Sequence, residues 1–414
     1  MGGPTARIRS SVRWASPLWA GLNFFQKTAC ALCAPSGEPE ESRMDSIRKK
    51  VAVVMPVRNE EAAVGPTMDA IFASTRLPDE IIIADGMSTD GTIAAIQRYG
   101  DRGVPIRVVN NPTIWAGGGR NAAIRVTDSD IIVLSDFGNT VEPGYIEEMV
   151  RPFEEDDTID IVGGLFRMRA TTHFEHCVAS IHYFEDYTLD RYSRDEIRQL
   201  IPPVVFPGGL CTAFTRRIWL AAGEQPEWLA KGQDKMFSRK VHAIGGKGLV
   251  AIDARIWHHV RSTPRDLFRQ LYLYGRGNGQ MRFLSKHAVL LMWIYGVLAL
   301  LLALGWFSPI FPALAAVLFG AYAWRAGIRK VIKVDGSLKK LRYIPVAMEV
   351  LLVRDIGSLL GHLVGWAEWI FVPRYQAHYR RYMGGLPEDR IPLIAPQLSG
   401  QSIFGRLRRV FGVA

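Results

Sequence analysis

Short apolar runs alternate with polar turns and helical patterns along the first two thirds of the chain. Within each run apolar residues follow one another without alternation, which is typical of strands buried on both faces of a parallel sheet. Because strands and helices take turns, the pattern predicts an α/β fold with a right-handed, doubly wound sheet. The predicted strands are Val51–Pro56, Glu80–Asp85, Ile106–Val109, Ile131–Leu134 and Leu249–Ile256.

The last third of the chain has longer apolar stretches, bordered by basic residues. Ala288–Phe307 is uncharged and long enough to cross a hydrocarbon core of about 30 Å as a helix. Ser308 and Pro309 end this stretch, and Ile310–Trp324 is a second one. Tyr343–Val372 is apolar but interrupted by charges. Because charges are costly inside a membrane, we expect one or two interfacial helices there instead of a crossing.

These patterns divide the chain into three parts. Residues 1–47 show little periodicity and are expected to form a flexible N-terminal extension, with Met44 as an alternative start of translation. Residues 48–285 form the predicted α/β domain. Residues 286–414 form a membrane region with a helical hairpin over 288–324, interfacial helices and a basic tail. The basic loop after the hairpin predicts a multi-pass protein of the cell (inner) membrane, with its α/β domain in the cytoplasm.

The formal net charge of +10 does not point to nucleic acid. The basic residues gather beside the apolar stretches, where anionic membrane lipids explain them. We therefore expect membrane lipids, and no nucleic acid, as partners. Cys30 and Cys33 form a lone C-x-x-C pair with no second pair or nearby histidine to complete a zinc site. Cys177 and Cys211 are interpreted as ordinary reduced thiols.

Two predicted strands end in an aspartate, Asp85 and Asp136, and a glycine-rich turn with Arg120 lies between them in sequence. Ligands of open α/β sheets bind at the carboxyl ends of the strands. A carboxylate there can accept from a base or ribose, an arginine can bind phosphate, and a metal on Asp136 can bridge two phosphates. Taken alone, Asp136 could simply cap a turn. Together these residues predict a site for a nucleoside diphosphate.

Seven segments carry a resemblance to a known family: VAVVMPVRNEE (51–61), EIIIADGMSTDGT (80–92), GGGRNAAI (117–124), IIVLSDFGNTVEPGYIEEM (131–149), PGGLCTAFTRR (207–217), GQDKMFSRKVHAIG (232–245) and WHHVRSTPRDLFRQLYLYGRGNG (257–279). In this order they resemble the family 2 glycosyltransferases, whose nucleotide-binding fold is called GT-A. The resemblance covers roughly residues 48–285. It is strongest to bacterial membrane-bound members that build exopolysaccharides or lipid-linked glycans.

The resemblance implies a set of donor-binding residues, in which Asp85 contacts the nucleotide base. The set is Pro56, Asn59, Glu60, Asp85, Arg120, Asp136, Gly208, Gly209 and Arg276. Arg276 could reach the diphosphate or a lipid phosphate, and the alternative for it is a purely interfacial cation.

The resemblance also implies a Mg²⁺ or Mn²⁺ cofactor, with Asp136 as the first aspartate of the Asp-any-Asp metal motif. The second aspartate of that motif falls at Gly138, and Asn139 could supply an oxygen instead, directly or through water. A histidine near the end of the fold often completes such a site. Here His258 or His259 could do so, and His258 is favoured. A structural role for this histidine pair is the alternative.

Asp234 is the predicted catalytic base, at the start of the helix Lys235–Ala243. The family carries its base in an acidic pair at this place, and Gln233 replaces the first acid while Asp234 keeps the second. An N-cap is the alternative role for Asp234.

The expected function is that of an inverting glycosyltransferase of polysaccharide or cell-envelope biosynthesis. It would move a sugar from a nucleotide-sugar donor to a membrane-associated, lipid-linked glycan acceptor. Two alternatives stay open: a polyprenyl-phosphate sugar synthase, and a catalytically inactive nucleotide-binding scaffold of a polysaccharide assembly complex. The first would use the lipid phosphate itself as acceptor. The second is suggested by Gly138 and Gln233, which replace two of the family's acids.

Overall fold

The structure is a computed structural model that describes residues 48–183, 208–335 and 343–386. The predicted flexible extension over 1–47 and the end of the basic tail lie outside the described residues. All elements below belong to the unit that begins at Arg48.

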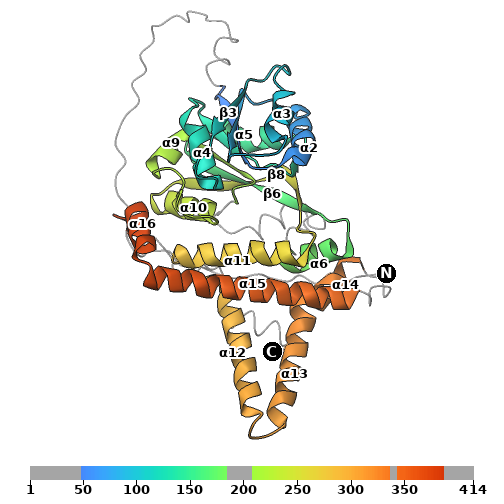
Figure 1. Cartoon of the computed structure of the whole chain (residues 1–414). Helices are drawn as coiled ribbons and strands as arrows, with labels where there is room; N and C mark the ends of the chain where they lie inside the picture. Colours follow the sequence, from blue (N-terminus) through green and yellow to red (C-terminus); the bar gives the residue numbers. More distant parts are fainter. Residues whose placement is uncertain (1–47, 184–207, 336–342, 387–414) are drawn as a thin grey trace, which may run out of the picture. The chain divides into compact units, whose positions relative to one another are not determined.

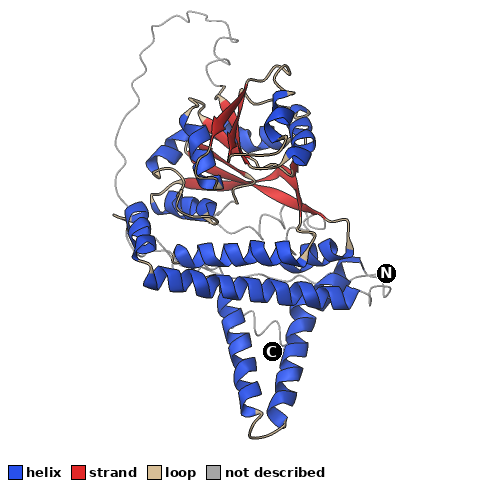
Figure 2. Ribbon diagram, viewed as in Figure 1, coloured by secondary structure: helices blue, strands red, loops and turns tan. Residues whose placement is uncertain are grey.

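One eight-stranded sheet with the order β3-β2-β1-β4-β7-β6-β8-β5 organises the α/β domain (Figures 1 and 2). Strands β3, β2, β1 and β4 pair in parallel, β7 is antiparallel to β4, and β5 is antiparallel to β8. The strands are β1 (Val51–Val57), β2 (Glu80–Asp85), β3 (Ile106–Asn110), β4 (Ile131–Leu134), β5 (Asn139–Val141), β6 (Ile159–Arg169), β7 (Thr212–Thr215) and β8 (Lys247–His259).

The doubly wound parallel prediction is therefore right for the half-sheet β3-β2-β1-β4 and wrong beyond β4, where the sheet is mixed. The reason is the connection. Gly208 and Gly209 lie just before β7, at the edge where β4 ends, so the chain enters β7 from that edge and runs opposite to β4. The fold class is a mixed α/β sheet, with the parallel, doubly wound topology confined to its first half.

Helices cover both faces of this sheet, and the alternation along β1 shows which face each one covers. Val51, Val53 and Met55 pack with α2 (Glu61–Phe72), α3 (Thr92–Gln97) and α5 (Tyr145–Glu155). Ala52 and Val54 pack with α4 (Ala116–Arg125), α9 (Arg216–Ala221) and α10 (Gln233–Ala243). Both faces of β1 are buried, as expected for a central strand.

Two long helices, α11 (Pro264–Gln280) and α15 (Tyr343–Phe371), lie side by side beneath the sheet domain (Figure 1). Their backbones touch because glycines face each other. A Cβ on Gly361 would meet the carbonyl oxygen of Tyr272, and one on Gly365 would meet that of Arg276. Helix α6 (His173–His182) also packs on α15. The predicted interfacial segment is thus one continuous helix, followed by α16 (Pro373–Met383).

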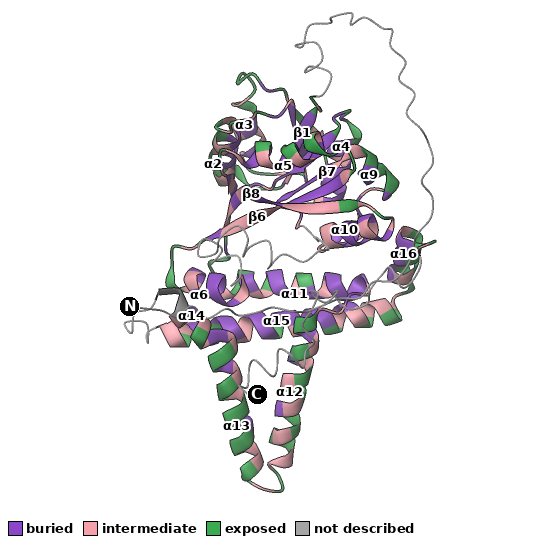
Figure 3. Cartoon of the chain, turned by 180° about the vertical axis from the view of Figure 1, so that it is seen from behind, coloured by how far each residue is buried: buried purple, intermediate pink, exposed green. Residues whose placement is uncertain are grey.

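Helices α12 (Lys286–Leu304) and α13 (Ile310–Ala323) form a hairpin that leaves the α11–α15 pair. The short π-helix η2 (Trp324–Ile328) and α14 (Arg329–Asp335) follow it. Among the described residues, two helices are long and apolar enough to cross a membrane, Lys286–Leu304 and Ile310–Ile332. Most of their surface is exposed or only partly covered (Figure 3). At the hairpin's base, the buried carboxylate of Asp355 accepts hydrogen bonds from the Tyr295 and Tyr322 hydroxyls.

Candidate active site

The loop after β1 and the loop after β2 are tied together around Asp85. The Asp85 carboxylate accepts from the backbone N–H of Ser88 at 3.1 Å. Asn59 joins the two loops: its N–H donates to the Ser88 hydroxyl at 3.0 Å, and its side-chain oxygen accepts from the Thr89 N–H at 2.8 Å. Pro56 lies opposite Ala84 in the β1–β2 register. Pro56, Asn59 and Asp85 therefore share one edge of the sheet.

Three residues at this edge have left-handed backbone conformations although none of them is glycine. They are Asn59 (φ 54°), Met87 (φ 62°) and Ile114 (φ 57°), one in each loop after β1, β2 and β3. For the β-branched Ile114 this conformation is a clear outlier. The loops also pack tightly at Gly86, where a Cβ would lie 3.3 Å from the Val57 carbonyl oxygen. Strained backbone of this kind gathers at ligand sites.

Asp136 follows β4 and is held by a buried arginine. Arg120, from the first half of α4, donates from Nη2 to the Asp136 carboxylate at 2.8 Å and to the Gly209 carbonyl at 3.0 Å. The Arg120 side chain is 3% exposed, whereas that of Asp136 is 36% exposed. The guanidinium therefore orients Asp136 from behind and leaves part of its carboxylate open to a ligand. β1 lies between β2, which ends in Asp85, and β4, which precedes Asp136, so these two strands are about 10 Å apart.

Asp234 joins the same cluster through Gly209. The Gly209 N–H donates to the Asp234 carboxylate at 2.7 Å, and the same glycine's carbonyl accepts from Arg120. A side chain on Gly209 would collide with the Arg120 guanidinium, so any larger residue here would displace Arg120. Gly208 lies beside the same Asp234 oxygen. Asp234 occupies the first turn of α10, where the helix dipole favours a carboxylate.

His258 and Asn139 meet across the β5–β8 pair. The two residues are register partners, and Nδ1 of His258 lies 2.7 Å from Oδ1 of Asn139. The pKa of His258 is lowered to about 4, mainly by burial and also by the positive charge of Arg261, while Asp136 opposes the shift. The imidazole is thus neutral at neutral pH and lies within electrostatic reach of Asp136. His259, the next residue, lies within electrostatic reach of Glu175.

The charged residues Lys231 and Arg261 also belong to this cluster, although neither was among the predicted site residues. Burial lowers the pKa of Lys231, Asp136 and Asp234 oppose the shift, and Arg120 and Arg261 reinforce it. The other four side chains, Asp136, Asp234, Arg120 and Arg261, therefore lie within electrostatic reach of Lys231. Neither Lys231 nor Arg261 makes a hydrogen bond or ion pair with a described residue. Lys231 does lie over the Tyr274 ring, 6.0 Å from its centroid. Two cations that form no ion pair with the described residues, beside two carboxylates, suit a polyanionic ligand.

Of these two cations, only Arg261 lies in a segment that the sequence analysis had singled out. Arg261 lies three residues beyond His258, inside the resembling segment 257–279. Lys231 stands just before the resembling segment 232–245, in a loop whose backbone rests against α11 at Gly277. Its position depends on contacts between distant parts of the chain, which no local pattern indicates.

Two predicted donor-binding arginines have other partners in the structure. Arg120 is buried and donates to Asp136 and Gly209, so its guanidinium is not placed to bind a phosphate directly. Arg276 points to α15, where Nε donates to Glu368 at 2.8 Å. The structure does not bring Arg276 to the cluster. Glu60 does belong there: desolvation raises its pKa, Arg261 opposes this, and Asp136 adds to it.

Asp136 and His258 fit a divalent cation that is also bound by a diphosphate. Mg²⁺ and related ions take few protein ligands in such sites, because substrate phosphates and waters supply the others. The Asn139 contact to Nδ1 of His258 is typical of a metal-binding histidine. Asn139 itself is 2% exposed and its oxygen is engaged with His258, so it is not placed as the predicted direct ligand. No group of three or more His, Cys, Asp or Glu ligands occurs among the described residues.

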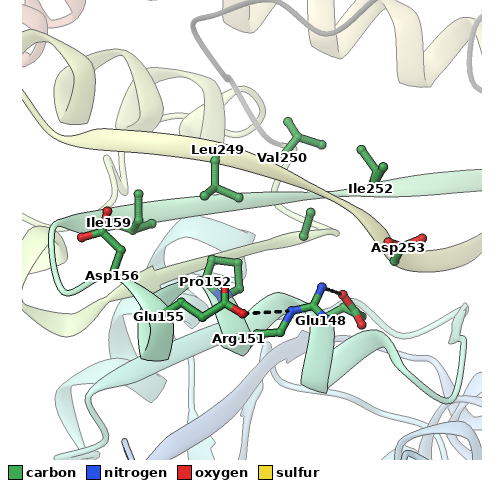
Figure 4. Close-up of a pocket in the computed structure, with 11 residues that line it drawn as sticks. Glu148, Arg151, Pro152, Glu155, Asp156, Ile159, Leu249, Val250, Ile252 and Asp253 are labelled. Carbon is green, nitrogen blue, oxygen red and sulfur yellow. Dashed lines mark hydrogen bonds and ion pairs between the residues drawn. The ribbon is translucent and has the colours of Figure 1, made fainter. Parts of the chain in front are cut away.

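A separate hollow of about 290 Å³ lies between α5, β6 and β8 (Figure 4). Acidic residues line it together with one arginine, Arg151. The charge of Arg151 is already compensated by ion pairs with Glu148 and Glu155. None of the predicted site residues lines this hollow. It therefore stands apart from the Asp85–Asp136–Asp234 edge.

Comparison with known proteins identifies a family for the part of the chain that carries Asp85, Arg120 and Asp136. Residues 52–219 match the model of the family described as Glycosyl transferase family 2. The O-antigen chain rhamnosyltransferase RfbN of Salmonella typhimurium is 22% identical over 54% of this chain and 70% of its own length. The hyaluronan synthase of Streptococcus pyogenes is 28% identical over 34% of this chain and 36% of its own length. The match thus spans about a third of the synthase.

A solved structure with a similar arrangement is a mannosyltransferase from Pyrobaculum calidifontis in complex with GDP-Man and Mn²⁺. It is 18% identical, covers 78% of this chain and 88% of its own, and superposes with a TM-score of 0.45.

The half-sheet, its acidic edge and the matched family model define a glycosyltransferase. More narrowly, residues 52–219 form a family 2 glycosyltransferase domain.

Proposed function

We propose that the protein is an inverting glycosyltransferase that moves a sugar from a nucleotide-sugar donor to a membrane-associated, lipid-linked glycan acceptor. Its role would be in polysaccharide or cell-envelope biosynthesis. The observation that carries this proposal is the chain of contacts from Asp136 through Arg120 and Gly209 to Asp234. It holds a donor-side carboxylate and a base candidate in one cluster. The rhamnosyltransferase relatives support the polysaccharide assignment.

The chemistry follows from the charges in the cleft. Asp234 would take the proton of the acceptor hydroxyl while that oxygen attacks the anomeric carbon from the face opposite the leaving group, which inverts its configuration. Negative charge then grows on the departing nucleoside diphosphate. Arg261 and Lys231, which form no ion pair with the described residues, would take up that charge. Asp85 would bind the base at the strained loop edge.

We also propose that Asp136 and His258 hold Mg²⁺ or Mn²⁺ when the donor is bound. The cation would supply a Lewis acid for the diphosphate oxygens. Arg120 fixes the carboxylate of Asp136, and Asn139 fixes the ring of His258.

The membrane assignment rests on the hairpin and on α15. The hairpin would anchor the protein in the cell membrane with the α/β domain in the cytoplasm. One face of α15 exposes Ile356, Leu360 and Leu363. Exposed arginines follow on α16, at 374, 380 and 381. An apolar face beside basic residues is typical of a helix lying in the surface of an anionic bilayer. Such a helix would bring the cleft above the lipid-linked acceptor.

The direct test is a thermal-shift panel of UDP-, GDP- and dTDP-sugars with and without Mn²⁺, followed by transfer to extracted bacterial lipids. A donor that binds the native state raises the melting temperature. We expect one nucleotide class to do so with metal, and the product to be an extended lipid-linked oligosaccharide. A lone sugar on polyprenyl phosphate would identify the synthase alternative. Donor binding with neither transfer nor hydrolysis would identify an inactive scaffold.

Replacing Arg261 with glutamine should weaken the use of the donor. A hydrogen bond to a charged group contributes about 1.5–3 kcal/mol, so kcat/KM for the donor should fall about 10- to 100-fold. Steady-state kinetics at varied donor concentration measure this. Arg265→Gln is the matched control, because Arg265 is also exposed but lies in the first turn of α11 and was not placed in the cluster. Equal losses in both variants would contradict a diphosphate contact at Arg261.

A further inference from the structure

The loop between Asp136 and β5 differs from the Asp-any-Asp pattern at a position where the structure has a tight turn. Gly138 has a left-handed backbone (φ 86°), and a Cβ there would meet nothing within 4 Å. Glycine is therefore needed for the backbone conformation and not for space. The turn carries the chain from the site edge directly into β5, whose first residue is Asn139. The missing aspartate is thus replaced by a turn that positions the next residue.

Asn139 is fixed on several sides. Its N–H donates to the Asp136 carbonyl at 3.3 Å, and its carbonyl accepts from the Thr67 hydroxyl at 2.9 Å. The same hydroxyl accepts from the Gly138 N–H at 3.2 Å. Asn139 is 2% exposed and pairs with His258 in the sheet register. Its side chain therefore has little freedom to turn toward a ligand.

The polar contact of that side chain is with His258. Oδ1 of Asn139 lies 2.7 Å from Nδ1 of His258, while its Nδ2 is buried and has no partner among the described residues. An amide oxygen can only accept, so Nδ1 of His258 must carry the hydrogen. The lone pair of the neutral ring is then on Nε2. A metal-binding histidine needs this arrangement, with one nitrogen held by an acceptor and the other free.

We propose that Asn139 is a positioning residue that sets the tautomer and orientation of His258 so that Nε2 serves as a ligand for the divalent cation. It would act through His258 and would not touch the cation. This inference rests on the proposed cation site. It explains how a chain without the second aspartate keeps two metal ligands, Asp136 and a preset imidazole.

The first test reads the tautomer directly in the metal-free protein. With ¹⁵N-labelled histidine, the nitrogen shifts of His258 at pH 7.5 distinguish a hydrogen on Nδ1 from one on Nε2, and the signal lost in His258→Gln assigns the residue. We expect the Nδ1–H form in the unsubstituted protein and in Asn139→Asp, whose carboxylate also accepts. Asn139→Leu should lose this preference. The Nε2–H form in the unsubstituted protein would overturn the proposal.

The second test measures binding of Mn²⁺ alone, from the electron paramagnetic resonance signal of the free ion. Loss of such a supporting contact typically costs 10- to 100-fold in metal affinity, so Asn139→Leu should weaken binding by about that factor. Asn139→Asp should retain binding and serves if Asn139→Leu does not fold. His259→Gln is the matched control and should bind normally. Unchanged affinity in Asn139→Leu would refute the role. If the unsubstituted protein bound Mn²⁺ but transferred no sugar, the proposed function would fail while the role of Asn139 would stand.

Discussion

Replacing Asp234 with asparagine should lower the rate of sugar transfer by about 10²- to 10⁴-fold, the usual contribution of a general base. Asparagine keeps an oxygen that can accept from the Gly209 N–H, which lies 2.7 Å from the carboxylate, so the contact to the Arg120–Asp136 pair should survive. What asparagine cannot do is take the acceptor's proton. The loss should therefore fall on kcat, with the donor KM nearly unchanged. Steady-state kinetics of the purified full-length protein measure both.

The donor-induced thermal shift separates this role from a structural one. If Asp234 is the base, Asp234→Asn should show the same rise in melting temperature with donor and Mn²⁺ as the unsubstituted protein. Asp253→Asn, which changes a carboxylate that lines the separate hollow, is the matched control and should transfer sugar normally. Full transfer by Asp234→Asn would remove the base assignment. Asp234 would then keep only a structural role, as the acceptor for the Gly209 N–H in the first turn of α10.

The first half of the fold could be predicted because its signals are local. Unbroken apolar runs predicted β1, β2 and β4, and the aspartates at the ends of two of these strands predicted the edge where a ligand binds. The second half of the fold could not be predicted in this way. The direction of β7 depends on the edge of the sheet from which the chain enters it, and no local pattern records that edge. The predicted strand Leu249–Ile256 is also longer in the structure, as β8 covers Lys247–His259. The last residues of β8 pair with β5, and this pairing sets the position of His258. A hydrophobic pattern does not predict such a pairing.

The candidate site was predictable in its carboxylates and less so in its cations. Asp136 and Asp234 stand at element ends that sequence patterns mark, and the structure links them through Gly209. An arginine, in contrast, has a long side chain whose direction depends on distant partners. Arg120 turns inward to Asp136, and Arg276 turns to Glu368, 92 residues away in sequence. Cations at the site edge come instead from Arg261 and from Lys231.

Asp136→Asn should abolish the metal-dependent thermal shift by the donor and also destabilise the protein. The buried Arg120 guanidinium would lose its charged partner. Breaking a fully buried ion pair costs about 3–5 kcal/mol. Because Asp136 is 36% exposed, solvent screens part of the interaction, and we expect a smaller loss of about 1–3 kcal/mol. Urea unfolding gives the stability, and the donor panel with Mn²⁺ gives the binding.

A second substitution separates the two effects of Asp136→Asn. Arg120→Met removes the buried cation, so the double variant Arg120→Met/Asp136→Asn no longer leaves a charge uncompensated. It should therefore be more stable than the sum of the two single losses predicts, as expected for residues in direct contact. The donor-induced shift should stay absent in the double variant, because the carboxylate that faces the ligand is still missing. If donor binding returned together with stability, Asp136 would be acting only as the partner of Arg120 and not as a ligand for the cation.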